Sequence, residues 1–211
     1  MLKIWGRRNS SNVQKVMWLV GELGLEHQRI DAGGSFGGLD RPEFLQMNPH
    51  GRVPVVDDDG VTVWESHSII RYLSAKYGRG SLWIDEPAQR SFADRWMDWS
   101  LATLQPDFMD LFWGFYRPKN AIGRRSTRWS PDVPDTFGCY RHLAGKCGLA
   151  GNRLTMADIP AGTAPYRYFE LEIDHPAVPN VTAWYERLQL RTPYRQHVMI
   201  PFDDLRGRLQ Y

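Results

Sequence analysis

The chain has 211 residues and a formal net charge of +2, and hydrophobic residues make up 42% of it. This composition is typical of a folded globular protein and excludes a largely disordered chain, and the small charge gives no indication of a nucleic-acid partner. No run approaches the roughly 18 consecutive apolar residues of a membrane span, and the opening residues lack a signal-peptide pattern. We therefore expect a cytoplasmic protein without a membrane partner.

The first part of the chain alternates between strand and helix patterns. Residues 2–6 form a short apolar run, and apolar positions then recur at helical spacing over 11–23. A second short strand is predicted at 28–31. The glycine-rich stretch at 33–38 that follows it matches no phosphate-binding motif and is predicted to be a loop.

A hairpin and a helix are predicted next. Pro54 stands at the start of a buried-looking strand, and because proline cannot donate to a sheet ladder, it indicates an edge, a bulge or a cis peptide that serves a site. The turn at 57–60 leads into a returning strand at 61–64. A helix follows with Ser66 as its predicted N-cap and Gly78 just past its end. The order βαβ-ββα is the thioredoxin-like topology.

The second half of the chain shows helical periodicity and no strand pattern. A long helix rich in aromatic residues is predicted from 86 to about 114, with a kink or break at Pro106. Prolines and glycines punctuate residues 117–148, and only a short helix near 135–146 is predicted there.

Three further helical segments are predicted toward the end of the chain. Thr155 and Asp158 form a capping-box pattern, in which the Thr hydroxyl accepts a backbone N–H while the Asp reaches back, and a helix should start there. An amphipathic helix is predicted at 179–191, and Pro193 opens another helical turn. The predicted fold is therefore α/β plus all-α, with a thioredoxin-like domain at 1–80 and a helical domain at 86–211.

Two neighbouring motifs resemble a known family. Residues 48–54 (NPHGRVP) and 64–73 (WESHSIIRYL) are similar to the paired glutathione-site motifs of cytosolic glutathione S-transferases. Residues 149–158 (LAGNRLTMAD) resemble the N-capping motif of that family's second domain. The opening at 5–16 is similar to bacterial members that place Ser or Thr, and not Tyr, after the first strand. The resemblance covers nearly the whole chain and implies a glutathione-binding, homodimeric transferase that needs no metal.

The resemblance implies a glutathione site around Val53 and Glu65. A cis Val53–Pro54 bond would turn the backbone groups of Val53 outward to pair with the cysteinyl part of glutathione. Glu65 is the expected partner of the γ-glutamyl ammonium, and the Ser66 hydroxyl at a helix N-terminus is the expected partner of its carboxylate. The candidates for the glycyl carboxylate are Arg52 and His50.

The chemistry requires a thiolate, because a free thiol with a pKa of about 8.5 is only slightly ionised at neutral pH. A hydroxyl at the start of the first helix can donate to the sulfur while the helix dipole favours its negative charge. Ser10 is preferred to Ser11 for this role, and the amide of Asn12 could assist. The alternative for all three is simple capping of the helix.

The electrophile site is expected between the domains. Trp113, Phe115 and Tyr116 are its candidate residues, against the alternative that they pack in the core. Two other functions remain open from the sequence: a glutathione-dependent disulfide reductase or peroxidase, and a non-catalytic binding protein of the same fold. No cysteine lies near Ser10, which excludes a glutaredoxin-like protein nucleophile.

Overall fold

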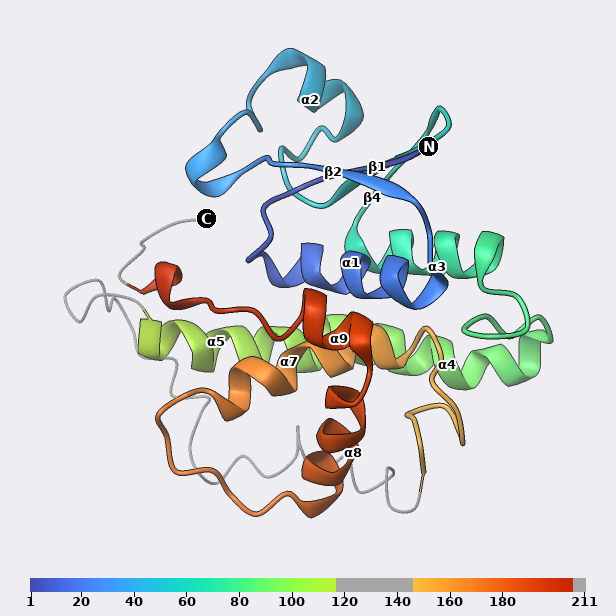
Figure 1. Ribbon diagram of the computed structural model, residues 1–211, viewed down its shortest axis with the longest axis vertical. Helices are drawn as coiled ribbons and strands as arrows, with labels where there is room; N and C mark the ends of the chain where they lie inside the picture. The colour runs from blue at the N-terminus through green and yellow to red at the C-terminus, as the bar shows by residue number, and fades with distance from the viewer. Residues whose placement is uncertain (117–145, 207–211) are drawn as a thin grey trace.

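The computed structural model describes residues 1–116 and 146–206 (Figure 1). The short helix predicted near 135–146 lies outside them, apart from residue 146. The elements of the first half are β1 (Leu2–Trp5), α1 (Ser11–Leu23), β2 (His27–Ile30), the 3-10 turn η1 (Gly34–Phe36), α2 (Pro42–Met47), β3 (Val55–Asp58), β4 (Val61–Trp64) and α3 (Ser66–Tyr77). Those of the second half are α4 (Pro87–Trp99), the π-helical turn η2 (Ser100–Leu104), α5 (Gln105–Tyr116), α7 (Asp158–Phe169), α8 (Pro179–Gln189), α9 (Thr192–His197) and the 3-10 turn η5 (Asp203–Leu205).

The four strands form one mixed sheet in the order β2-β1-β3-β4. β1 runs parallel to β2 and antiparallel to β3, and β3 and β4 form the predicted hairpin. Helices α1 and α3 cover the face of the sheet that looks toward the second half, and α2 lies on the opposite side (Figure 1). The predicted thioredoxin-like half followed by a helical half is confirmed. Within the described residues, α2 and the short turns η1 and η5 were not predicted.

Helix α1 lies between the sheet and the helices of the second half (Figure 1). The Trp18 ring is fully buried and packs edge-on against the Tyr194 ring of α9, with ring centroids 4.8 Å apart. A Cβ on Gly162 of α7 would stand 2.9 Å from the same indole, so a glycine is needed where α7 crosses α1. One continuous apolar core therefore includes residues of both halves.

The long helix predicted at 86–114 is interrupted just before Pro106. There the backbone N–H of Gln105 donates to the oxygen of Ser100, five residues back, which closes a π-type turn between α4 and α5. Pro106 has no N–H with which to continue the helical ladder, so this is where the regular spacing of the bonds is easiest to change.

The capping motif before α7 has Asp158 at its centre. Its carboxylate accepts the backbone N–H groups of Leu149 and Thr155, each at 2.8 Å, and the Thr155 hydroxyl at 3.1 Å. The predicted reach-back of the acid is confirmed, but the hydroxyl donates to Asp158 and does not accept a backbone N–H, and the helix begins at Asp158. Burial raises the pKa of Asp158 to about 6.

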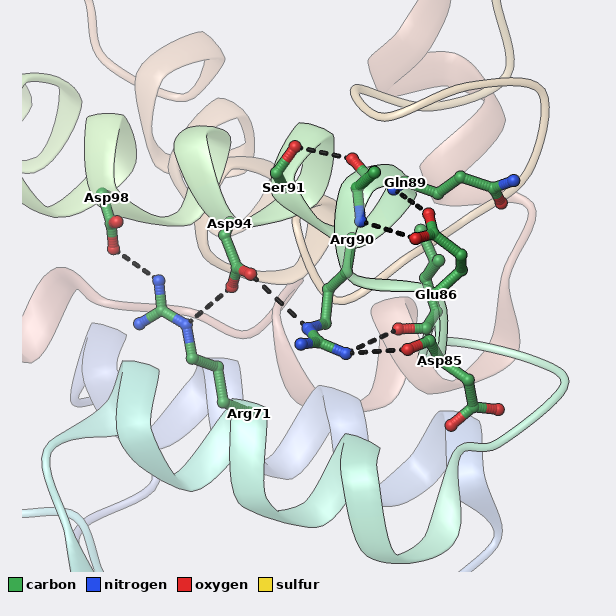
Figure 2. A network of polar contacts seen from close by, with 10 residues as sticks. Arg71, Asp85, Glu86, Gln89, Arg90, Ser91, Asp94 and Asp98 are labelled. Atoms are coloured by element: carbon green, nitrogen blue, oxygen red, sulfur yellow. Dashed lines mark hydrogen bonds and ion pairs between the residues drawn. The ribbon is translucent and has the colours of Figure 1, made fainter.

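A polar network joins α3 to α4 at the boundary between the two halves (Figure 2). Arg71 of α3 donates to Asp94 at 3.1 Å and also pairs with Asp98 of α4. Arg90 lies 3.7 Å from the other oxygen of Asp94.

None of the helices in the described part of the chain is long and apolar enough to cross a membrane.

Candidate functional site

Three strand ends meet in one row across the sheet. Trp5, the last residue of β1, pairs with Val55, the first residue of β3, and Val55 pairs with Trp64, the last residue of β4. The loop before α1, the residues before β3 and the start of α3 therefore leave the sheet at the same edge. This edge holds most of the predicted site.

The Val53–Pro54 peptide bond is cis, as predicted. Val53 is partly exposed and Pro54 is buried. A Cβ on Gly6 would come within 3.3 Å of the Val53 Cβ and 2.4 Å of a methyl of Val13. The loop that leads from β1 to α1 thus passes directly against Val53, and only glycine fits at that crossing.

Glu65 and Ser66 open α3 at the same edge. Glu65 is exposed and has a positive φ of 67°, a conformation that non-glycine residues seldom adopt. It is the N-cap of α3, and its carbonyl accepts from the N–H of Ile69. The prediction of Ser66 as N-cap is therefore wrong by one position, because Ser66 already has helical geometry and its buried hydroxyl faces Asn12.

Ser10, Ser11 and Asn12 lie at the start of α1. Ser10 is the N-cap residue and is 8% exposed, and its carbonyl accepts from Gln14, but its hydroxyl makes no capping bond. Capping therefore does not account for this hydroxyl. Ser11 is the partly exposed first residue of the helix, and the Asn12 side-chain oxygen accepts from the Ser66 hydroxyl at 3.5 Å.

A buried lysine lies directly behind these residues. The Nζ of Lys15 donates to the Asn12 Oδ1 at 2.9 Å and to the Gln105 Oε1 at 2.5 Å, and it lies 3.4 Å from the Nε2 of His67. Lys15 and Gln105 were not among the predicted site residues. The available signal was a lysine in the middle of a helix that is apolar over most of its length.

Burial changes the ionisation of this cluster. It lowers the pKa of Lys15 to about 7, against the opposing effect of the negative charge of Glu65. It also lowers the pKa of His67 to about 3, helped by the positive charges of Lys15 and Arg71. A neutral His67 ring can accept the Lys15 proton in a hydrogen bond.

His50 and Arg52 lie on the loop before Val53. Both are exposed, and the His50 ring packs at 5.1 Å from the Trp64 ring. The loop is held from inside by Asn48, which is 2% exposed, accepts the N–H of His50 and donates to the carbonyl of Arg52. Asn48 was missed as a positioning residue, although it stands within the motif that drew attention to this segment.

The structure does not gather the three predicted electrophile residues on one face of α5. Tyr116 is buried and stacks on Phe112 at 4.5 Å, and Trp113 meets the edge of the same ring at 5.3 Å. Phe115 is 52% exposed. Tyr116 and Trp113 therefore belong to a second aromatic cluster, and Phe115 lies outside it.

Arg167 of α7 links this aromatic cluster to the loop before Ser10. Its guanidinium lies over the Phe112 ring at 5.4 Å and donates to the carbonyl of Asn9 at 2.6 Å. It also donates to the side chain of Gln14 at 3.2 Å. This arginine is 1% exposed, so the contact is internal to the fold.

A hollow of about 380 Å³ borders the outer side of the same loop. Its walls come from the β1–α1 loop, the end of β2 and the segment after α9. Its charged lining residues are Arg7, Arg8, Arg29, Asp31 and Asp204. These charged walls distinguish the hollow from the aromatic electrophile site that the sequence predicts.

Comparisons with known proteins agree with this geometry. Residues 1–75 match the family model of the glutathione S-transferase N-terminal domain, and residues 139–191 match the model of the C-terminal domain. The chain is also 36% identical over 206 residues to glutathione S-transferase GstB of Escherichia coli K12, covering 95% of this chain and 99% of that relative. The chain belongs to the glutathione S-transferase family. It is accordingly an enzyme of the glutathione transferase class.

Solved structures of glutathione S-transferases have the same fold. The theta-class enzyme of Xanthomonas axonopodis pv. citri, solved with glutathione bound, is 40% identical with a TM-score of 0.85, covering 95% of this chain and 98% of that one. A glutathione transferase of Bombyx mori is 26% identical with a TM-score of 0.78, covering 94% and 93%. The likeness extends over both halves of the molecule.

Proposed function

We propose that the protein converts the glutathione thiol to a thiolate at Ser10 for attack on small electrophiles. The observation that carries this proposal is the meeting of the β1, β3 and β4 ends in one row, with the Asn12–Ser66 contact joining the helices that start there. The Ser10 hydroxyl is not used to cap α1, so it can donate to a sulfur at the positive end of the helix.

Glutathione would lie along this edge with its three parts on different residues. The γ-glutamyl ammonium pairs with Glu65, and its carboxylate takes the Ser66 hydroxyl and the N-terminus of α3. The cysteinyl backbone pairs with Val53. The glycyl carboxylate is met by Arg52 and His50, whose exposed side chains border the same loop.

The second substrate in this proposal is a small hydrophobic electrophile. An aromatic surface linked to the site is the cluster that holds Trp113 and Tyr116, which Arg167 connects to the loop before Ser10. Phe115 would take part only from outside this cluster, since its ring is exposed and not packed in it. A homodimeric assembly and a cytoplasmic location, both implied by the family resemblance, complete the proposal.

A matched pair of serine variants tests the catalytic role. We expect Ser10→Ala to raise the pKa of the enzyme-bound thiol, measured by ultraviolet titration of the thiolate, by at least about one unit. It should lower kcat/KM with an aryl halide about 100-fold, as loss of one donor to a developing anion does. Ser11→Ala is the control and should change neither value. An unchanged thiol pKa in Ser10→Ala, or the larger effect in Ser11→Ala, would remove Ser10 from this role.

The disulfide reductase or peroxidase alternative would use the same thiolate. Assays of the wild type with an aryl halide, a small disulfide and an organic hydroperoxide, at equal enzyme concentration, rank the three activities. Conjugation should dominate. Failure to bind immobilised glutathione would instead support the non-catalytic binding protein.

A further inference from the structure

Lys15 is a buried lysine with no role in the mechanism described so far. It is 4% exposed, in the part of α1 that is buried on all sides from Val13 to Val20. Placing an ammonium there is unfavourable unless polar partners compensate for the lost water. The two oxygens that it contacts come from different halves of the molecule.

The partner from the second half is Gln105, the first residue after the π turn. The Gln105 N–H bonds to the oxygen of Ser100, so an extra residue is accommodated immediately before this side chain. Such turns re-aim the residues around them and are frequent at functional sites. Here the result is a bond of 2.5 Å from the Lys15 Nζ to the Gln105 side chain across the boundary between the halves.

The partner toward the site is Asn12. An ammonium can only donate, so the Asn12 atom that faces Lys15 must be the oxygen. The Ser66 hydroxyl approaches the same oxygen at 3.5 Å. With the oxygen engaged from two sides, the Nδ2 amide is the side of the group left to face a substrate at the start of α1.

The charges around the Lys15 ammonium fit a role at the thiol. Glu65 acts on it from the N-terminus of α3, and the His67 ring beside it is kept neutral by burial. Arg71 is the further cation that acts on His67. When it is protonated, Lys15 thus places a positive charge within hydrogen-bond distance of Asn12, near the start of α1.

We propose that Lys15, anchored by Gln105 of the helical half, is a positioning residue that orients Asn12 to donate its Nδ2–H to the glutathione sulfur. This rests on the proposed function of the same site. Lys15 touches no substrate in this arrangement and acts through Asn12. The thiolate subsite would therefore form correctly only when the helices of the second half pack against α1.

The test uses Lys15→Met and Gln105→Leu in the full-length protein. Lys15→Met should raise the pKa of the bound thiol by about one unit, and lower kcat/KM below that pKa about tenfold. The change should appear in kcat more than in the KM for glutathione. Gln105→Leu should change the thiol pKa and kcat/KM in the same directions, but by smaller amounts. The controls are Lys3→Met and Gln89→Leu, exposed residues on β1 and α4 that lie outside this cluster.

Coupling between the two residues gives a second readout. If they act as one unit, the double variant should resemble Lys15→Met alone, whereas independent effects would add. A merely structural lysine predicts a changed thermal midpoint with an unchanged thiol pKa, and that result would overturn the proposal. So would additive effects.

Further variants keep the test decisive if Lys15→Met does not fold. Lys15→Arg should keep most of the wild-type activity, because arginine is also a cationic donor. Gln105→Leu alone still tests the hydrogen bond between Lys15 and Gln105. A wild type that forms no thiolate at all would defeat the proposed function itself. If the wild type forms a thiolate and Lys15→Met behaves in the same way, only this inference would be overturned.

Discussion

His67 is, with Lys15, one of two residues at the site whose ionisation the surrounding fold strongly opposes. Its ordinary pKa of 6.5 falls to about 3 in the folded protein, because the ring is buried beside the Lys15 and Arg71 charges. Between these two values the unfolded chain binds more protons than the folded one, so stability rises with pH across this interval and is lost as the pH falls.

We therefore expect the free energy of unfolding to fall by up to about 2 kcal/mol between pH 6.5 and pH 5 through this histidine alone, at about 1.4 kcal/mol per pH unit. Urea denaturation at a series of pH values measures it. His67→Gln should flatten the dependence, and His27→Gln, with a partly exposed ring on the sheet edge, should not. Equal slopes in wild type and His67→Gln would contradict the prediction.

At the residue scale, the sequence predicted what neighbouring residues determine. The residues of the two glutathione-site motifs, and the cis bond at Val53, follow from local patterns. The Lys15 cluster does not, because its partners His67 and Gln105 lie 52 and 90 residues further along the chain. The N-cap of α3 was displaced by one position because the positive φ of Glu65 leaves no mark in the residue type.

At the scale of single elements, two carboxylates at helix starts allow a direct comparison of buried and exposed acceptors. Asp158, the first residue of α7, is fully buried and accepts from three groups of Leu149 and Thr155. Glu86 before α4 accepts from the N–H groups of Ala88 and Gln89 but is exposed. Water can replace the acceptor in the second case and has no access in the first.

Asp158→Ala should therefore lower the free energy of unfolding by about 3 kcal/mol, since buried donors lose their acceptor. Glu86→Ala should lower it by about 1 kcal/mol or less. Chemical denaturation of both variants against wild type measures the difference. Similar losses in the two variants would show that burial of the accepting carboxylate does not determine its contribution to the free energy of unfolding.

Elements with a strong period were predictable, and those set by tertiary context were not. α1, α3 and α8 were located within one or two residues, because their apolar spacing is regular. Pro106 correctly marked an interruption, but whether a proline gives a kink or a π turn depends on tertiary contacts of the residues beside it, here that of Gln105 with Lys15. The six-residue helix α2 has too few turns for any period to be recognised.

At the scale of the whole molecule, the order of the two halves was predicted but their interface was not. The chain gives no indication that Trp18 packs against α7 and α9, or that Arg167 reaches the loop before Ser10. Among the arginines that bond across this boundary, Arg71 and Arg167 lie in different settings. Arg71 is 30% exposed in the network of Figure 2, and Arg167 is 1% exposed.

This contrast predicts unequal effects of the same substitution. Exposed ion pairs contribute about 1 kcal/mol or less, so Arg71→Met should change stability little, and less still in high salt. Arg167→Met should cost about 3 kcal/mol, because the buried Gln14 side chain and the part-buried Asn9 carbonyl lose a charged donor. It should also lower kcat/KM, since the loop that Arg167 holds leads directly into Ser10. Denaturation curves and steady-state kinetics on both variants measure these effects. An Arg167→Met protein with full activity would mean that the loop keeps its position without this bond between the halves.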